Sequence, residues 1–202
     1  FKNFQIKSKN LNTKKIFNEL FKKKSEVLNS LSKSYKNSFN SKILNKYKSY
    51  SNFKVIGMGG SSLGSKAIYF FLRKKIKKNF KFLDNLSPHK KLNKKISCNL
   101  IISKSGNTVE TIINANVFIN KNDKNIFITE KKNNYLLKLA QNLKSEIIHH
   151  NNYIGGRYSV LSEVGMVPAE LMGLKPENFK NLNNLVKNKK FTNTLISNVN
   201  SI

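Results

Sequence analysis

Short runs rich in β-branched and aromatic residues alternate with longer amphipathic runs through the middle of the chain. This alternation is typical of right-handed β–α–β crossovers, in which helices cover both faces of a parallel sheet. We therefore predict an α/β fold, a three-layer αβα sandwich with a five-stranded parallel sheet. The predicted strands are residues 53–56, 80–83, 99–102, 125–129 and 146–149. The predicted helices between them are residues 63–75, 89–94, 108–120 and 134–143.

Apolar residues recur at three- and four-residue spacing between lysines over residues 11–50, which predicts a helix before the sheet. A further helix is expected over 158–174, and a weak one in the polar tail. The expected domains are 1–50, an N-terminal helical segment; 51–175, the sheet domain; and 176–202, the truncated start of a following region. The chain starts at Phe1 and not at methionine, so we expect a piece of a longer protein.

Two features of the composition exclude classes of protein. No apolar run approaches the ~18 residues that a membrane helix needs, so a membrane protein is excluded. The single cysteine, Cys98, excludes a disulfide framework and a cysteine-built zinc site. A reducing, cytoplasmic location is the expectation.

The charge is strongly positive, with 38 Lys and Arg against 10 Asp and Glu. Such a balance raises nucleic acid as a partner. However, only two of these basic residues are arginine, the residue that bidentate base and phosphate recognition favours. The lysines are also spread over the whole length, and asparagine is nearly as frequent, at 32 residues. We interpret the charge as a lysine- and asparagine-biased solvated surface and expect no nucleic-acid partner.

Ligands of open parallel sheets bind outside the carboxyl ends of the strands, so the loops after the strands are the places to search. The first unusual loop, residues 57–62, contains three glycines and two serines. Glycines let the backbone approach a ligand closely, and Ser61, Ser62 and the free amides of the next helix suit a phosphate or a sugar hydroxyl. A tight structural turn is the alternative. The loop does not match the dinucleotide-binding fingerprint.

The second loop, residues 103–108, places three hydroxyls, one lysine and a glycine in six residues. Asn107 is expected to cap the following helix, with Glu110 as its capping-box partner. Hydroxyls, amides and an ammonium at a helix N-terminus form a cradle for a phosphomonoester. The alternative is an ordinary serine-rich helix cap. The Gly-Lys-Ser/Thr ending of a nucleotide P-loop is missing.

The third loop follows the last predicted strand and contains Gly155, Gly156 and Arg157. A guanidinium beside closely approaching backbone amides can stabilise a developing oxyanion. The alternative is a salt bridge at the start of a helix.

Together the three loops resemble the glucose-6-phosphate isomerase family. Residues 55–64 resemble its first glycine motif, 103–111 its phosphate loop, and 152–162 with 164–169 its signature segment. The resemblance covers residues 53–174 in the family's order. The third motif is close to diagnostic, whereas the second is shared with other sugar-isomerase (SIS) domains.

The resemblance implies a dimeric enzyme of glycolysis and gluconeogenesis that interconverts glucose 6-phosphate and fructose 6-phosphate. It implies no metal and no organic cofactor, and two SIS subdomains, each with a five-stranded parallel sheet. By motif position, the phosphate-binding residues would be Ser103, Lys104, Ser105 and Thr108. Gly60 and Ser61 would line the sugar site, and Arg157 with Gly156 would stabilise the cis-enediolate.

The resemblance also implies that parts of the catalytic machinery are missing from these residues. The family's glutamate base and its assisting histidine and lysine lie downstream of the arginine motif. We expect Glu163 and Glu170 to be structural, His149 and His150 to end a strand, and His89 to have no catalytic role. These 202 residues alone are therefore expected not to isomerise sugars at a useful rate.

Two alternatives remain open from the sequence. One is another SIS protein: a bifunctional phosphoglucose/phosphomannose isomerase, an aminosugar-phosphate synthase domain or a sugar-phosphate sensor. The Gly-Gly-Arg-Tyr-Ser segment argues against the synthase and the sensor, while the sequence of the missing half would decide the bifunctional isomerase. The other alternative is a basic nucleic-acid-binding protein.

Overall fold

The structure is a computed structural model, and it describes residues 11–23, 25–86, 96–180, 184–185 and 187–200. The helix predicted at 89–94 lies outside the described residues. The chain forms two compact units. One is Lys36–Pro176, and the other joins the described parts of Phe1–Tyr35 and Glu177–Ile202.

The larger unit is built on a five-stranded sheet in which every neighbouring pair of strands is parallel. The strand order is β2-β1-β3-β4-β5, and the register pairs Ile56 with both Leu83 and Ile101. The strands are β1 (Asn52–Ile56), β2 (Asn79–Leu83), β3 (Cys98–Ile102), β4 (Lys124–Thr129) and β5 (Glu146–His149). All five lie within one residue of their predicted limits, so the predicted α/β fold is confirmed.

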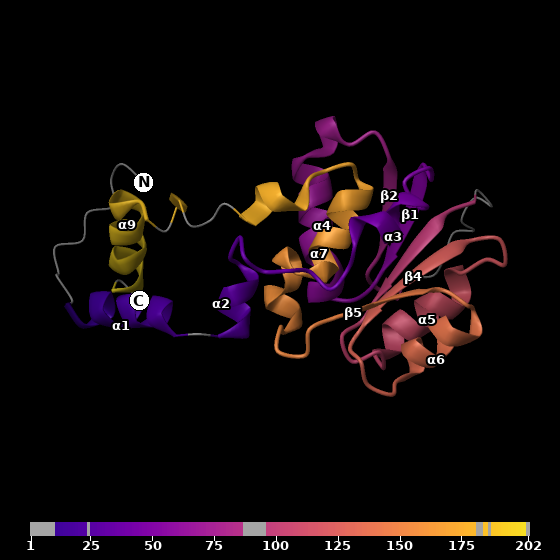
Figure 1. The fold of residues 1–202 in the computed structure, drawn as a ribbon, viewed down its shortest axis with the longest axis horizontal. Coiled ribbons are helices and arrows are strands. Elements are labelled where there is room, and N and C mark those ends of the chain that lie inside the picture. The colour runs from indigo at the N-terminus through magenta and orange to yellow at the C-terminus, as the bar shows by residue number, and fades with distance from the viewer. Residues whose placement is uncertain (1–10, 24, 87–95, 181–183, 186, 201–202) are drawn as a thin grey trace. The chain divides into compact units, whose positions relative to one another are not determined.

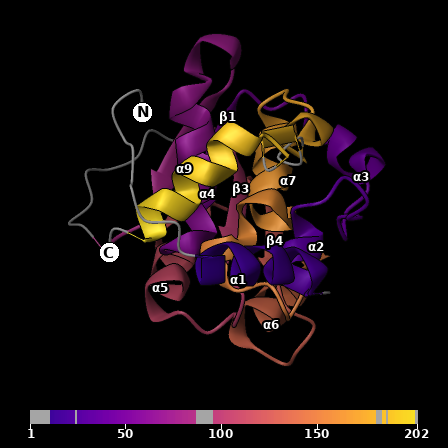
Figure 2. The ribbon, with the colours of Figure 1, turned by 90° about the vertical axis from the view of Figure 1, so that its left-hand side faces the viewer.

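Helices cover both faces of this sheet. The crossover helices are α4 (Gly60–Phe71), followed by a 3-10 turn at Arg73–Lys75, α5 (Val109–Phe118) and α6 (Tyr135–Asn142). The helix α7 (Glu163–Leu171) packs against α4 on one face, and α5 and α6 lie on the other (Figure 1). Figure 2, turned by 90°, again separates α5 and α6 from α4 and α7. Because both faces are covered, β3 is buried along its whole length.

A buried polar network lies at the amino-terminal side of the sheet. The Lys54 ammonium on β1 donates to Asp123 Oδ2 at 2.9 Å. Asn99 Nδ2 donates to the same oxygen at 3.0 Å, and the Ser97 amide donates to Asp123 Oδ1 at 3.1 Å. Burial raises the pKa of Asp123, but the hydrogen bonds from Lys54, Asn99 and backbone amides outweigh it, so the pKa lies below its ordinary value.

The continuous helices predicted at 11–50 and at 158–174 are both interrupted. Three helices occupy the first range: α1 (Leu11–Lys22), α2 (Glu26–Ser30) and α3 (Ser41–Asn45). Ser25 and Asn40 have extended backbones and cap α2 and α3 through side-chain oxygens. An extended residue cannot continue a helix, so each of them begins a new one. The second range contains a 3-10 helix, η2 (Gly156–Leu161), and then α7, because Ser162 between them is extended.

The smaller unit contains α1 and a C-terminal helix, α9 (Lys189–Val199), with a 3-10 turn, η3 (Pro176–Lys180), at the junction with the larger unit. Helices α1 and α9 contact each other, and Thr13 Oγ1 donates to Asn200 Oδ1 at 2.6 Å. None of the helices in the described part of the chain has the length and apolar character that a bilayer-crossing segment needs.

Candidate functional site

The strand order places the switch point of the sheet between β1 and β3. The chain leaves β1 toward β2 on one side and leaves β3 toward β4 on the other. In open parallel sheets, ligands bind at such a switch point, outside the carboxyl ends of the strands. Residues 57–62 follow β1 and residues 103–108 follow β3, so two of the three predicted loops flank this point.

The loop after β1 lies directly against the end of β3. A Cβ at Gly57 would fall 2.7 Å from the carbonyl oxygen of Ile102, so only glycine allows this approach. Two of the expected free amides of α4 are not available, because Ser61 and Ser62 donate theirs to the carbonyls of Met58 and Gly59. The half-buried Ser61 hydroxyl bonds to nothing in the described part of the chain, so it is the group that this loop offers.

The start of α4 also lies against the loop that carries Arg157. A Cβ at Gly60 would fall 2.2 Å from the carbonyl carbon and oxygen of Gly156 and 2.9 Å from the Arg157 amide nitrogen. Ser159 Oγ donates to the Gly156 carbonyl at 2.6 Å and to the Gly60 carbonyl at 3.4 Å. The first and third motifs therefore meet backbone to backbone.

The loop after β3 is folded by its own hydroxyls. Ser103 Oγ lies 2.8 Å from Thr108 Oγ1 and accepts the Gly106 amide at 3.2 Å. Gly106 has a φ of +67°, in the region that glycine favours. Ser105 is exposed, and its Oγ accepts the Asn107 amide at 3.3 Å. The loop thus presents hydroxyls at the N-terminus of α5.

The predicted cap of α5 was wrong. Thr108, not Asn107, occupies the N-cap position, and no side chain caps this helix. Asn107 Oδ1 instead accepts the Tyr135 amide at 2.9 Å, at the start of the neighbouring helix α6. The first amides of α5, at residues 109–111, therefore donate to no partner among the described residues. Free amides at a helix N-terminus attract an anion.

Asn134 supports this loop, a role that the sequence analysis did not predict. It is buried, and a Cβ at Gly106 would fall 1.9 Å from its Oδ1. The Asn134 amide group donates to Lys132 O at 2.8 Å and to Thr129 Oγ1 at 3.2 Å, while Oδ1 accepts the Leu137 amide at 2.8 Å. The Asn134 side chain thus caps α6 and also fills the space that a Cβ at Gly106 would need.

Lys104 joins the second loop to the third. Its ammonium donates to the Asn152 carbonyl at 2.6 Å, and its own carbonyl accepts the Glu130 amide at 3.0 Å. The backbone of Lys104 is therefore held at the end of β4, while its side chain reaches the turn that precedes Gly155.

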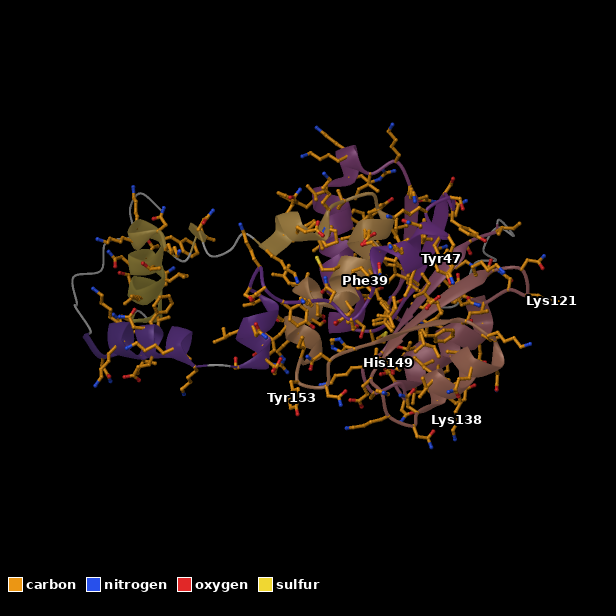
Figure 3. All side chains as sticks on the ribbon, viewed as in Figure 1. Phe39, Tyr47, Lys121, Lys138, His149 and Tyr153 are labelled. Atoms are coloured by element: carbon orange, nitrogen blue, oxygen red, sulfur yellow. The ribbon has the colours of Figure 1, made fainter. Side chains whose placement is uncertain are left out.

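Arg157 is exposed in the first turn of η2. Its guanidinium forms no hydrogen bond or ion pair with any residue that the structure describes, so the alternative of a helix-start salt bridge is not observed. Tyr153, in the turn just before this loop, is 74% exposed and projects outward (Figure 3). A free guanidinium at this edge is available to a ligand.

Both glutamates of α7 are used inside the protein. Glu163 is buried, and its Oε1 accepts the Ser38 amide at 3.0 Å. Burial raises the pKa of Glu163, but hydrogen bonds from His150 and Ser38 outweigh it and hold the pKa below its ordinary value. Glu170 accepts Ser41 Oγ at 2.9 Å and pairs with Lys48 at 3.0 Å.

The sequence of residues 16–198 matches the model of one protein family, phosphoglucose isomerase. The chain belongs to the phosphoglucose isomerase family. The resemblance seen in the three loop motifs is thereby confirmed. Among curated relatives, glucose-6-phosphate isomerase of Methanocaldococcus jannaschii is 39% identical over 153 residues, which cover 65% of this chain and 36% of that protein. The Borreliella afzelii enzyme is 36% identical over 141 residues, which cover 59% of this chain and 26% of that protein.

The chain therefore spans about a third or less of the curated relatives that it matches. Solved structures share its fold at lower identity. A hypothetical protein of Thermus thermophilus matches with a TM-score of 0.67 and 20% identity, over 94% of this chain and 51% of that chain. Tagatose-6-phosphate ketose/aldose isomerase of Escherichia coli matches with a TM-score of 0.50 and 15% identity, over 71% of this chain and 44% of that chain. These two solved structures and this chain thus share a fold.

Proposed function

We propose that the complete protein containing this chain is a glucose-6-phosphate isomerase. The observation that carries the proposal is the mutual contact of the three motif loops at the switch point of the sheet. Gly57 lies against Ile102, Gly60 against Gly156, and Lys104 donates to Asn152. The proposal is also supported by two curated relatives, which are named glucose-6-phosphate isomerase.

The second loop is proposed to hold the phosphate. Its candidate donors are the side chains of Ser103, Lys104, Ser105 and Thr108, together with the uncapped amides of α5. The Lys104 ammonium would exchange the Asn152 carbonyl for a phosphate oxygen, because a charge-assisted hydrogen bond is the stronger of the two. The dipole of α5 favours the same charge.

The other two loops are proposed to hold the sugar and the reacting oxygens. Gly60 and Ser61 would line the sugar site. When a base removes the proton from C2, negative charge develops on O1, and the proton then returns to C1 while the O2 proton moves to O1. The Arg157 guanidinium, beside the Gly156 backbone, would stabilise that charge in the cis-enediolate.

The base itself is proposed to come from residues beyond this chain. Glu163 and Glu170 are engaged with Ser38, His150, Ser41 and Lys48, so neither is free to move a proton on a substrate. The resemblance implies a downstream glutamate, histidine and lysine for proton transfer and ring opening. We propose a cytoplasmic homodimer that needs no metal or organic cofactor.

The test is conversion of fructose 6-phosphate to glucose 6-phosphate by the complete protein after treatment with a chelator. Turnover without added cofactor supports the proposal. A protein that binds the sugar phosphate without converting it would instead be a sensor, and the proposed activity would be wrong.

A further inference from the structure

The imidazole of His150 joins the two ends of the segment that carries Arg157. His150 directly follows β5 and is only 3% exposed. Its Nδ1 lies 3.3 Å from Glu163 Oε2, and its Nε2 lies 3.0 Å from the carbonyl oxygen of Ile154. Ile154 lies just before η2, and Glu163 begins α7 just after it. The His150 ring therefore contacts a residue at each end of the Arg157 segment.

Both partners of this ring are hydrogen-bond acceptors. The Ile154 carbonyl has no proton to donate, and the low pKa of Glu163 keeps its carboxylate ionised. Each ring nitrogen of His150 therefore lies against one acceptor. The second oxygen of Glu163 is held by the Ser38 amide.

The backbone, and not a side-chain contact, sets the position of Arg157. Its guanidinium bonds to no residue that the structure describes, so its place follows from where η2 lies. At the amino-terminal end of η2, the Ile154 amide donates to the Asn151 carbonyl at 3.2 Å, and the Ile154 carbonyl is held by His150. Without the ring, a buried carbonyl would lose its donor and the turn would lose this anchor.

We propose that His150 is a positioning residue for Arg157. Its ring holds Ile154 and Glu163 together, and so keeps η2 where the guanidinium meets the reacting oxygens of the sugar phosphate. This inference rests on the proposed isomerase function. It differs from the sequence expectation that His150 merely ends a strand.

The test compares three single variants of the complete protein. His150→Phe keeps a ring and removes both ring nitrogens, and we expect kcat to fall about tenfold or more, because small misplacements of a catalytic group are costly. KM should change less than about twofold, because the phosphate loop is untouched. His150→Gln keeps a donor group, so its kcat should lie between that of His150→Phe and that of the unmodified protein. His149→Gln is the matched control, since the His149 ring Nδ1 has no hydrogen-bond partner among the described residues, and its kcat should stay unchanged.

A double-mutant cycle separates positioning from a general effect on the fold. In an Arg157→Lys background, His150→Phe should cost less than about twofold in kcat, because there is no guanidinium left to position. An equal loss in both backgrounds would overturn the inference while leaving the role of Arg157 intact. An unchanged kcat for Arg157→Lys alone would instead overturn the proposed role of Arg157. If His150→Phe does not fold, His150→Gln takes its place in the cycle.

Discussion

Gly60 and Gly156 are in direct backbone contact, and this contact joins the first glycine loop to the loop of Arg157. A Cβ at Gly60 would fall 2.2 Å from two backbone atoms of Gly156. Because these are backbone atoms, rotation of a side chain cannot relieve the clash. The two motifs are far apart in the sequence, so the pairing is a property of the fold. It explains why the first residue of α4 is glycine.

Gly60→Ala should therefore destabilise the protein and displace the arginine loop. We expect a loss of about 1–3 kcal/mol in the free energy of unfolding, as for overpacked cores, and a lower kcat. Urea unfolding followed by circular dichroism measures the first quantity. Gly155→Ala is the matched control, because a Cβ there meets only Tyr158 Cδ2 at 3.8 Å. Equal stability of the two variants would contradict the contact.

Arg157→Ala should lower kcat by about 10²–10³-fold in the complete protein, because one preorganised group that stabilises a developing oxyanion is lost. KM should change little, since the phosphate donors remain. Steady-state kinetics with fructose 6-phosphate measures both constants. A variant with normal kcat would show that the guanidinium does not meet the reacting oxygens.

Lys104→Ala should act on binding first. The ammonium is proposed to contact the phosphate in the ground state and in the transition state alike, so its loss should raise KM about tenfold with a smaller change in kcat. Lys124→Ala, at the opposite end of the strands, serves as a control with the same loss of charge. If both variants raised KM equally, the effect would come from the overall charge and not from the loop.

The buried pair of Lys54 and Asp123 should make stability fall at low pH. The folded-state pKa of Asp123 is lowered, so its contribution is present above the unfolded-state value of about 3.9 and is lost as the pH falls through the folded value. Glu163 acts in the same direction. Unfolding measured from about pH 6 to pH 3 should show this loss.

Asp123→Asn should remove part of that pH dependence and cost about 3–5 kcal/mol, because it leaves the Lys54 ammonium buried and unpaired. Glu146→Gln is the control. It breaks an ion pair with Lys46, whose side chain is 60% exposed, and exposed pairs contribute little. A similar cost for the two variants would argue against a buried pair in solution.

The sequence predicted the sheet well because buried parallel strands are continuous apolar runs between polar turns. Residues such as Ile101 and Phe127 belong to such runs and lie in the core. The periodicity over 11–50 was a weaker guide, since Ser25 and Asn40 interrupt it as caps. Local sequence could not show that Asn107 would accept the first amide of a different helix, because that contact depends on the placement of α6 beside the loop.

The motifs were predicted to lie together, and the structure brings their loops into contact. Their supporting residues were not predicted. Two contacts show this: Asn134 lies against Gly106, and Glu163 lies against His150. In each contact, the two residues are far enough apart in the sequence that no local pattern predicts it. The roles of the eight proposed site residues stay predictions.

A crystal structure of the complete protein with fructose 6-phosphate tests the central proposal most directly. The account predicts the phosphate within about 3.2 Å of Ser103, Thr108 and the Lys104 ammonium, and the Arg157 guanidinium at hydrogen-bond distance from O1 or O2 of the sugar. A phosphate bound away from residues 103–108, or a guanidinium that does not reach the same sugar, would contradict it.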